Sequence, residues 1–195
     1  MVFVYQIADS VGAGVKKITR NLQAKLTASD TQLLARAKDG DNSAFTELVR
    51  RHQNNIYRLA YGYLGEREAA RDAAQEVFLK AYQGLPYFQS DSQFSTWLYS
   101  IGKNHCLNII RREKLAEKID PPESAAVDSH LPLRMKLKKL LGKLKDEHRD
   151  ILILRYYQDL KYEQIAGTLN ISLDTVKVRL FRAKAELKKL MGEGL

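Results

Sequence analysis

Apolar residues recur at spacings of three and four along most of this chain, and this pattern limits the fold more than any other feature. Such spacing places apolar side chains on one face of an α-helix. The strict alternation expected of a half-buried strand is not convincing anywhere in the sequence. With 195 residues, of which 45% are hydrophobic, the chain can bury one moderate core or two small ones. The sequence therefore predicts an all-α fold.

One stretch without helical periodicity interrupts this pattern. Asp120–Pro132 contains three of the four prolines together with turn-forming residues. We predict that residues 116–132 form a flexible linker between two small helical domains, at 29–115 and 133–195.

The first domain is expected to begin near residue 29. Ser29 and Asp30 offer a helix N-cap before Leu33, Leu34 and Ala37, and Asp39–Asp41 contains a glycine that would end this helix. Residues 1–28 are basic and weakly amphipathic. We predict a loosely ordered extension there, with a membrane- or partner-binding tail as the alternative.

The net charge of +9 favours a polyanionic partner, either nucleic acid or an acidic membrane face.

No apolar run approaches the ~20 residues needed to span a bilayer. Asp9 interrupts the region from Val2 to Val15 where a signal peptide would need an unbroken apolar stretch. The lone Cys106 cannot form an internal disulfide or a cysteine-cluster zinc site. We therefore expect a cytoplasmic protein, with Cys106 as a small half-buried apolar residue rather than a reactive thiol.

The segment Tyr162–Lys184 has the layout of two helices joined by a tight turn, in which Asn170 tolerates a left-handed conformation and Ser172 can cap the second helix. One face of that second helix is apolar and is expected to be core: Val176, Leu180, Ala183 and Leu187. The opposite face is basic with an exposed aromatic ring: Lys177, Val178, Phe181 and Arg182, with Lys184 at its edge. Such a helix after a sharp turn suits entry into a DNA major groove, whereas an ordinary solvated face is the alternative.

The segment Glu68–Tyr82 predicts a helix with two different faces. One face is apolar: Ala70, Ala74, Val77, Phe78 and Ala81. The other carries acidic and amide groups with one leucine: Asp72, Gln75, Glu76 and Leu79. On a protein of net charge +9 this second face is a poor DNA contact and a plausible docking face for another protein. From these residues alone, an ordinary solvated helix face is as well supported as a docking face.

The segment Phe94–Arg112 predicts a helix that holds the only tryptophan and ends in basic residues. Its apolar stripe is best explained as core: Phe94, Trp97, Leu98 and Ile101. Its polar side chains suit phosphate or base contacts: Lys103, Asn104, Asn108, Arg111 and Arg112. The preceding loop, residues 88–93, could hold an unstacked base. His105 has no second histidine at metal-binding spacing, so we expect a helix-surface histidine, and neither a metal nor a cofactor.

Four segments in the same order resemble the extracytoplasmic-function sigma factors of bacterial RNA polymerase, in the sigma-70 family: Asp72–Tyr82, Phe94–Asn104, Tyr162–Ala166 and Asp174–Lys184. The resemblance covers about residues 29 to 191. It implies a non-enzymatic subunit that binds core polymerase and directs promoter-specific initiation. It also implies a stress-response role and an anti-sigma factor that holds the protein inactive.

The resemblance also implies which residues act. Core polymerase, through its β′ clamp helices, would be bound by Asp72, Gln75, Glu76 and Leu79, and its β flap is the second implied contact. The minus-ten promoter element would be melted and bound by Phe88, Ser92, Phe94, Lys103, Asn104, Asn108, Arg111 and Arg112. The minus-thirty-five element would be bound by Thr175, Lys177, Val178, Arg179, Phe181, Arg182 and Lys184. Among these, Arg179 lies nearer the helix flank, where a phosphate contact is expected.

Three positions depart from the family pattern. Ser100 stands where a basic residue is common, Lys145 replaces a frequent proline, and Asp174 replaces a frequent glycine. The first weakens one expected backbone contact, the second can loosen a helix start, and the third is compatible with a helix N-terminus.

Two other classes of protein compete with this interpretation. A helix-turn-helix regulator that acts without polymerase would use the second domain alone and bind duplex DNA by itself. A nucleic-acid-processing enzyme would need a carboxylate cluster, a histidine pair, a nucleophile or a phosphate-binding glycine loop, and none is found.

Overall fold

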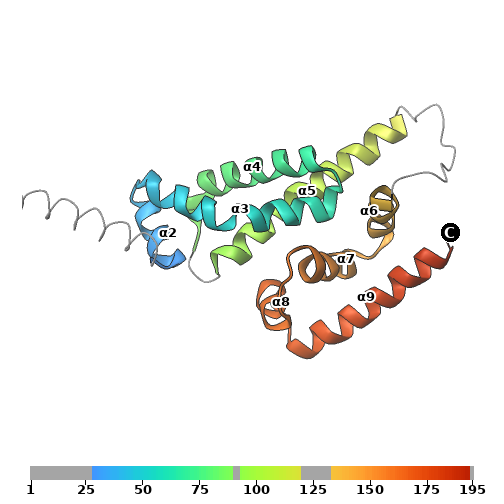
Figure 1. Cartoon of the computed structure of the whole chain (residues 1–195). Coiled ribbons are helices and arrows are strands. Elements are labelled where there is room, and N and C mark those ends of the chain that lie inside the picture. Colours follow the sequence, from blue (N-terminus) through green and yellow to red (C-terminus); the bar gives the residue numbers. More distant parts are fainter. Residues whose placement is uncertain (1–27, 90–92, 120–132, 194–195) are drawn as a thin grey trace, which may run out of the picture. The chain divides into compact units, whose positions relative to one another are not determined.

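The computed structural model describes residues 28–89, 93–119 and 133–193, and this described part contains helices and no β-strand (Figure 1). The helices in chain order are α2 (Asp30–Lys38), α3 (Asn42–Leu64), α4 (Arg67–Gly84), the 3₁₀-helix η1 (Leu85–Tyr87), α5 (Phe94–Ile119), α6 (Leu133–Lys143), α7 (Asp146–Leu152), the π-helix η2 (Ile153–Tyr157), α8 (Tyr162–Leu169) and α9 (Leu173–Glu193). The all-α prediction is confirmed. The predictions on residues 1–27, on Ser92 and on the stretch 120–132 lie outside the described residues.

The chain divides into two compact units whose boundary lies inside α3, between Arg51 and His52. The predicted domain boundaries at 29, 115 and 133 therefore remain predictions.

In the first unit, a capping box starts α2. The Ser29 hydroxyl accepts a hydrogen bond from the Gln32 amide, and the Gln32 side chain accepts one from the Ser29 amide at 2.9 Å. Leu33, Leu34 and Ala37 are buried, as their spacing predicts. Gly40, at φ +90°, then turns the chain toward α3. The predicted N-cap at Ser29 is confirmed.

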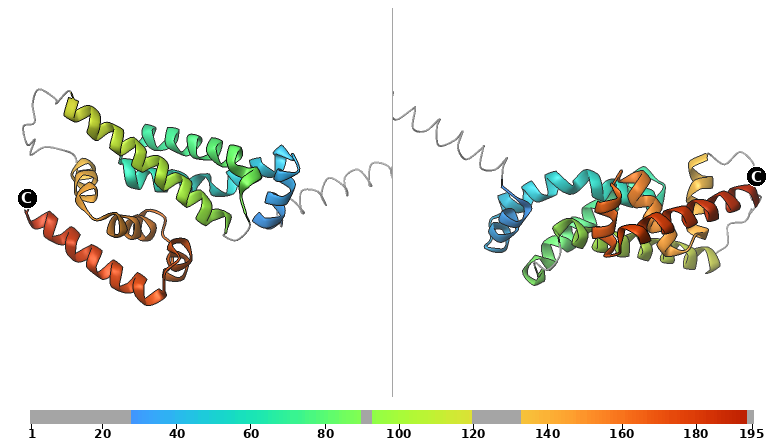
Figure 2. Two further views of the ribbon diagram at one scale, coloured as in Figure 1. Left: turned by 180° about the vertical axis from the view of Figure 1, so that it is seen from behind. Right: turned by 90° about the horizontal axis from the view of Figure 1, so that it is seen from below.

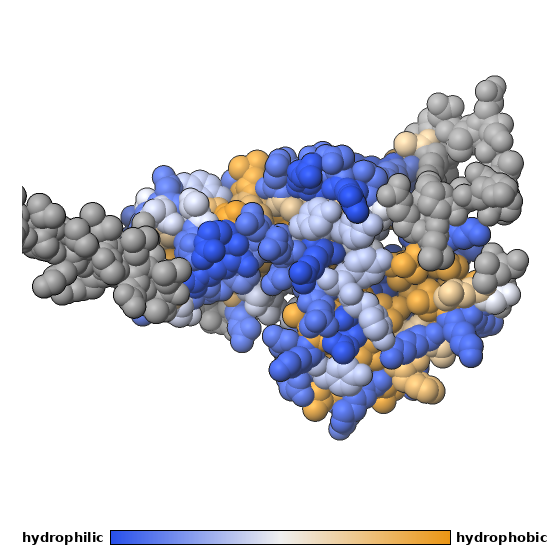
Figure 3. All heavy atoms as spheres, in the orientation of Figure 1, coloured by the Kyte–Doolittle hydropathy of each residue, from blue (hydrophilic) through white to orange (hydrophobic). Residues whose placement is uncertain are grey.

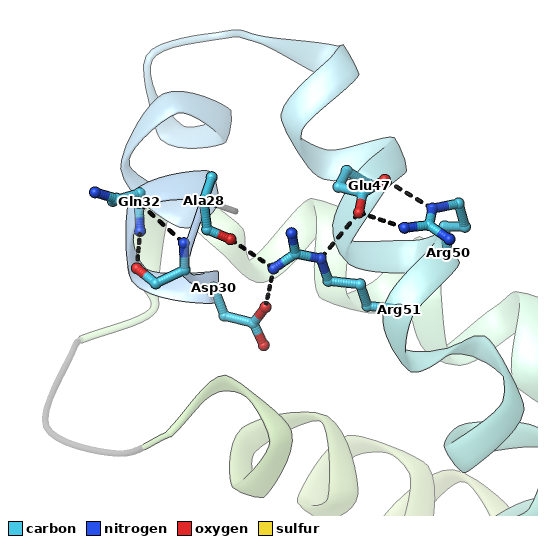
Figure 4. Close-up of polar contacts among 7 residues, drawn as sticks. Ala28, Asp30, Gln32, Glu47, Arg50 and Arg51 are labelled. Carbon is cyan, nitrogen blue, oxygen red and sulfur yellow. Dashed lines mark hydrogen bonds and ion pairs between the residues drawn. The ribbon is translucent and has the colours of Figure 1, made fainter. Parts of the chain in front are cut away.

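Arg51 connects the beginning of α2 to α3 within this unit (Figure 4). Its guanidinium donates to the Ala28 carbonyl at 2.7 Å and to Asp30 at 3.1 Å, and its Nε donates to Glu47 at 2.9 Å. Hydrogen bonds from Arg50 and Arg51 lower the pKa of Glu47 to about 2. A single arginine thus satisfies a backbone carbonyl and two carboxylates.

In the second unit, α4 and α5 pack side by side (Figures 1 and 2). The buried side of α4 is the predicted one: Ala70, Ala74, Val77, Phe78 and Ala81, joined by Ala73. On α5, Phe94 and Leu98 are buried, whereas Trp97 and Ile101 are half-buried. Gly102 allows a close approach, since a Cβ there would lie 2.8 Å from Leu59.

The later helices bury a second set of aliphatic side chains, from α7, η2, α8 and α9: Ile151, Leu152, Ile153, Leu154, Ile165, Val176, Leu180 and Ala183. The lysine-rich helix α6 ends at Lys143. The next helix, α7, starts at Asp146, and the chain continues from Ile153 as the π-helix η2. Lys145 is the N-cap residue of α7 and makes no side-chain hydrogen bond there.

The left-handed conformation of Asp159, at φ +54°, generates a stability prediction. Replacing Asp159 by glycine removes the steric cost of a Cβ in this conformation, and its ion pair with Arg155, at 3.5 Å and largely exposed, contributes little. We expect Asp159→Gly to raise the free energy of unfolding by about 0.5–1 kcal/mol in urea denaturation. Asp159→Asn is the matched control, because asparagine tolerates the same conformation, and it should leave stability unchanged. A fall in stability for the glycine variant would contradict the strain argument.

Candidate nucleic-acid and protein interfaces

The turn before α9 has the geometry that the sequence predicts. Asn170 is left-handed at φ +52°, and its amide bonds the Ala166 carbonyl. The Ser172 hydroxyl accepts from the Thr175 amide at 3.1 Å and lies 2.8 Å from the Thr175 hydroxyl. These contacts end α8 and start α9. Thr175, a predicted DNA contact, is itself half-buried in this cap.

The two predicted faces of α9 are both present. Val176, Leu180 and Ala183 are buried, and Leu187 is half-buried. The outward face carries the predicted set of exposed side chains: Lys177, Val178, Phe181, Arg182 and Lys184. Phe181 is 75% exposed, which is unusual for an aromatic ring on a structural face. Figure 3 shows apolar residues at the surface of the region that holds helices α6 to α9.

The basic side chains of α9 differ in their interactions with neighbouring residues. Arg179, which is half-buried, pairs with Glu147 of α7 at 3.2 Å, and Lys177 pairs with the exposed Asp174 at 3.0 Å. The Lys184 ammonium lies 5.6 Å from the Tyr156 ring centroid, and its hydrogen bond with Tyr156 raises the pKa of Lys184. Among the described residues Arg182 forms no ion pair, so its guanidinium is available for a base edge.

A groove of about 330 Å³ runs beside this face. Its lining combines two arginines with two carboxylates: Glu147, His148, Asp174, Thr175, Val178, Arg179 and Arg182. Glu147 and Tyr156 were not among the predicted site residues. Both come from helices outside the recognised motif and reach α9 only through tertiary packing.

The acidic face of α4 is exposed as predicted. Asp72, Gln75, Glu76 and Leu79 all lie on the solvent side of the helix, and Leu79 is 51% exposed. Within the described part of the chain, neither Asp72 nor Glu76 forms an ion pair. An apolar side chain surrounded by unpaired carboxylates suits a basic protein surface better than DNA.

Phe88 and Phe94 require a correction, because the structure places both rings in the interior. Their exposed fractions are 5% and 3%. Phe88 lies 4.7 Å from the Trp97 ring and 6.2 Å from Phe94, and Phe94 makes an edge contact with His52 at 5.4 Å. Neither ring can contact a base without leaving this aromatic cluster.

Four of the predicted minus-ten residues form one continuous exposed face on α5: Asn104, Asn108, Arg111 and Arg112. The spacing of four, three and one residues puts them on one side of the helix. Lys103 differs from them, because it is half-buried and its ammonium donates to Asp150 of α7. Ser100 donates to the Thr96 carbonyl and so makes a local helix contact.

His105 and Cys106 are neighbours on α5, and each has a shifted pKa. The Lys80 ammonium lies 2.6 Å from His105 Nδ1, and partial burial together with this charge lowers the pKa of His105. Cys106 is fully buried rather than half-buried as predicted, and burial raises the pKa of its thiol to about 12. No cluster of three potential metal ligands occurs among the described residues.

We predict that Cys106 is unreactive in the native protein. The thiolate is the reactive form, and a buried thiol with a raised pKa is neither charged nor accessible at neutral pH. Thiol titration with an aromatic disulfide at pH 8 should detect no thiol in the native protein and one after unfolding in guanidinium. Rapid native modification would contradict the burial of Cys106.

The sequence matches two known family models. Residues 48–116 match the sigma-70 region 2 model, and residues 134–187 match the sigma-70 region 4 model. No helix among the described residues combines the length and apolar character that crossing a membrane requires.

Curated relatives match over most of both chains. The ECF RNA polymerase sigma factor SigW of Bacillus subtilis is 33% identical over 176 residues, which cover 80% of this chain and 93% of that relative. The RNA polymerase sigma-H factor of Pseudomonas aeruginosa is 32% identical and covers 83% of this chain and 93% of its own length.

Two solved structures share the fold. CnrH in complex with the cytosolic domain of CnrY has a TM-score of 0.61 and 26% identity, covering 83% of this chain and 96% of that one. The sigma factor RpoE of Bartonella quintana, solved with the anti-sigma factor NepR, has a TM-score of 0.54 and covers 76% of this chain and 96% of that one. At 22% identity the second supports the fold alone.

Proposed function

Because this chain belongs to the extracytoplasmic-function group of the sigma-70 family and is an alternative sigma factor of RNA polymerase, we propose which of its residues perform each step. The observation that carries the proposal is the separation of three outward faces with different chemistry. One is acidic on α4, one is polar and basic on α5, and one is basic and aromatic on α9.

We propose that the acidic face of α4 binds core polymerase. Asp72 and Glu76 carry free carboxylates beside the exposed Leu79, and Gln75 completes the surface. A central apolar residue within a polar rim is the usual composition of a protein interface. The β′ clamp helices are the proposed partner of this face, and the β flap is the proposed partner of the later helices.

The face of α5 is proposed to bind the minus-ten element. Asn104 and Asn108 can hydrogen-bond unstacked bases, and Arg111 and Arg112 can hold the phosphates. Opening a duplex costs a few kcal/mol per unstacked base, which binding of the exposed base can offset without ATP. Phe88 and Phe94 support this surface as buried packing residues and make no direct contact in the proposal.

The outward face of α9 is proposed to bind the minus-thirty-five element in the major groove. Arg182 is assigned to a base edge, because its guanidinium is exposed and can bond guanine with two hydrogen bonds. Val178 and Phe181 are assigned to apolar contacts such as thymine methyl groups. Lys177, Arg179 and Lys184 are assigned to phosphates, and Thr175 to the cap that aims the helix.

Three further features belong to the same proposal. The protein acts in the cytoplasm, where RNA polymerase is found, and it catalyses no reaction of its own. An anti-sigma factor is proposed as its regulator, since the similar CnrH was solved in complex with the cytosolic domain of CnrY.

The docking assignment predicts the result of run-off transcription with purified core polymerase on a promoter library. The double variant Asp72→Ala, Glu76→Ala should reduce specific initiation about 5- to 150-fold, because losing two interface charges costs on the order of 1–3 kcal/mol. The double variant Asp39→Ala, Glu163→Ala is the control, since it removes the same charge from exposed positions outside this face. It should retain initiation.

The rival function has a different outcome in the same experiment. If core polymerase stays inactive while the protein alone still shifts duplex DNA, the protein is a regulator that uses only its helix-turn-helix. Equal loss in both double variants would instead show that net charge matters and the face of α4 does not.

The base-edge assignment of Arg182 predicts a sequence-dependent loss. Arg182→Ala should cost roughly 1–3 kcal/mol on the preferred upstream element and much less on unrelated sequences, measured as relative affinities of holoenzyme at one salt concentration. Lys188→Ala, which removes an exposed charge farther along α9, is the control and should weaken both kinds of site slightly. An equal loss for Arg182→Ala on all sequences would assign Arg182 to a phosphate.

A further inference from the structure

His105 of α5 belongs to none of the three proposed functional faces, and its neighbours carry positive charge. The ring is half-buried, and the Lys80 ammonium of α4 lies 2.6 Å from its Nδ1. The Arg112 guanidinium lies near enough to disfavour a charge on the ring. Within the described part of the chain, Glu76 is the one carboxylate that favours the charged ring. A cluster of cationic side chains therefore spans α4 and α5.

The free hydrogen-bonding groups of this cluster are donors. An ammonium can only donate, so Nδ1 of His105 accepts from Lys80 and the ring proton lies on Nε2. Among the described residues, the Nε2 group has no hydrogen-bond partner, and neither Lys80 nor Arg112 forms an ion pair. Both cations retain unused N–H groups. Several donors without an acceptor suit an anion that has several oxygen atoms, such as a phosphate.

The cluster adjoins the α5 face assigned to the minus-ten element. Asn108 and Arg112 follow His105 by three and seven residues, a spacing that places them along one side of the helix. From His105 to Arg112 the helix axis advances roughly 10 Å at about 1.5 Å per residue. Successive phosphates of a stacked strand are about 3.4 Å apart. A strand whose base contacts Asn108 therefore carries phosphates within reach of this cluster.

We propose that Lys80 and His105, with Arg112 beside them, bind a backbone phosphate of the single-stranded minus-ten DNA, and that His105 takes up a proton from the solvent on binding. This inference rests on the proposed function, because the minus-ten assignment of α5 places the strand. A phosphate between Lys80 and the ring offsets the repulsion between two cations. Protonation of Nδ1 then gives the ring a donor at each nitrogen, and Lys80 donates to the phosphate instead of to Nδ1.

The two protonation equilibria give the sign of the pH dependence. In the free protein, partial burial and the charges of Lys80 and Arg112 lower the pKa of His105, while Glu76 opposes them. In the complex, the negative phosphate raises the pKa of His105. The complex therefore binds more protons than the free protein at pH values between these two pKa values. DNA affinity should rise as the pH falls through that interval.

The protonation of His105 can be measured by NMR titration of the full chain without polymerase. The chain has four histidines, and the His105→Gln variant identifies the resonance of His105. Saturation with a short mixed-sequence single-stranded DNA should move the midpoint of the His105 titration to higher pH. A midpoint that DNA leaves unchanged would show that Lys80 and His105 only join α4 to α5, and it would overturn the proposal.

Inorganic phosphate separates the two possible sources of the anion in the same titration. At an equal total concentration of phosphate groups it should move the midpoint much less than DNA, because it lacks the neighbouring contacts of the strand with Asn108. An equal shift would assign the cluster to free phosphate and overturn the assignment to DNA.

Fluorescence anisotropy with the same DNA measures the effect of the proton on affinity. At constant ionic strength, the wild type should bind several-fold more tightly at pH 6 than at pH 8. The His105→Gln variant keeps a neutral N–H donor but cannot take up a proton, so its affinity should depend much less on pH. An unchanged pH dependence in this variant would overturn the role of His105.

The contribution of Lys80 is measured from the salt dependence of the same binding. Lys80→Gln should weaken binding and lower the slope of log affinity against log salt by about 0.7 to 1. Lys38→Gln is the matched control, because it removes the same charge from an exposed position at the end of α2. Equal losses in both variants would show an effect of net charge and overturn the site. Failure of the proposed function appears elsewhere, as absent initiation with core polymerase, and leaves the histidine titration intact.

Discussion

The packing of α4 against α5 decides which side chains of both helices remain outside. Helices α4 and α5 pack together with the alanines and Val77 of α4 and Leu98 of α5 buried, and Gly102 permits a close approach to Leu59. Small side chains allow the helices to approach, and their burial leaves longer polar residues on the opposite faces. The packing of α4 against α5 therefore leaves both the acidic face of α4 and the polar face of α5 exposed to solvent. The same relation holds for α9, whose buried Val176 and Leu180 turn Phe181 and Arg182 outward.

Charge placement separates the functions of these faces. Carboxylates without ion partners on α4 repel DNA and attract a basic protein surface, while the amides and arginines of α5 and α9 do the opposite. Individual cations are further restrained by neighbours, as Glu147 holds Arg179 and Tyr156 holds Lys184. Such restraint lowers the conformational entropy that a side chain loses on binding DNA.

The phenylalanine residues show where helix periodicity is insufficient to predict which side chains are buried. The resemblance to the family implies Phe88 as a DNA contact, yet Phe88 is buried against Trp97. Phe94 fits both a core stripe and a DNA contact in the sequence, and the structure places it in the core. Phe181 is equally aromatic and is the one that is exposed. At the end of a helix, too few residues follow the helical periodicity to predict whether an aromatic ring faces the core or the solvent. Contacts with residues distant in the sequence determine whether such a ring is buried.

Local patterns in the sequence determined the helices, their caps and their apolar faces, because the groups that interact lie within four residues of one another. Ser29, Asn170 and Ser172 act as predicted for this reason. Only the tertiary structure decided that Lys103 meets Asp150, 47 residues away, and that Gly62 must lack a Cβ beside Ile153. No spacing rule connects such positions, since the distance between them is set by how helices pack and not by the rise of one helix.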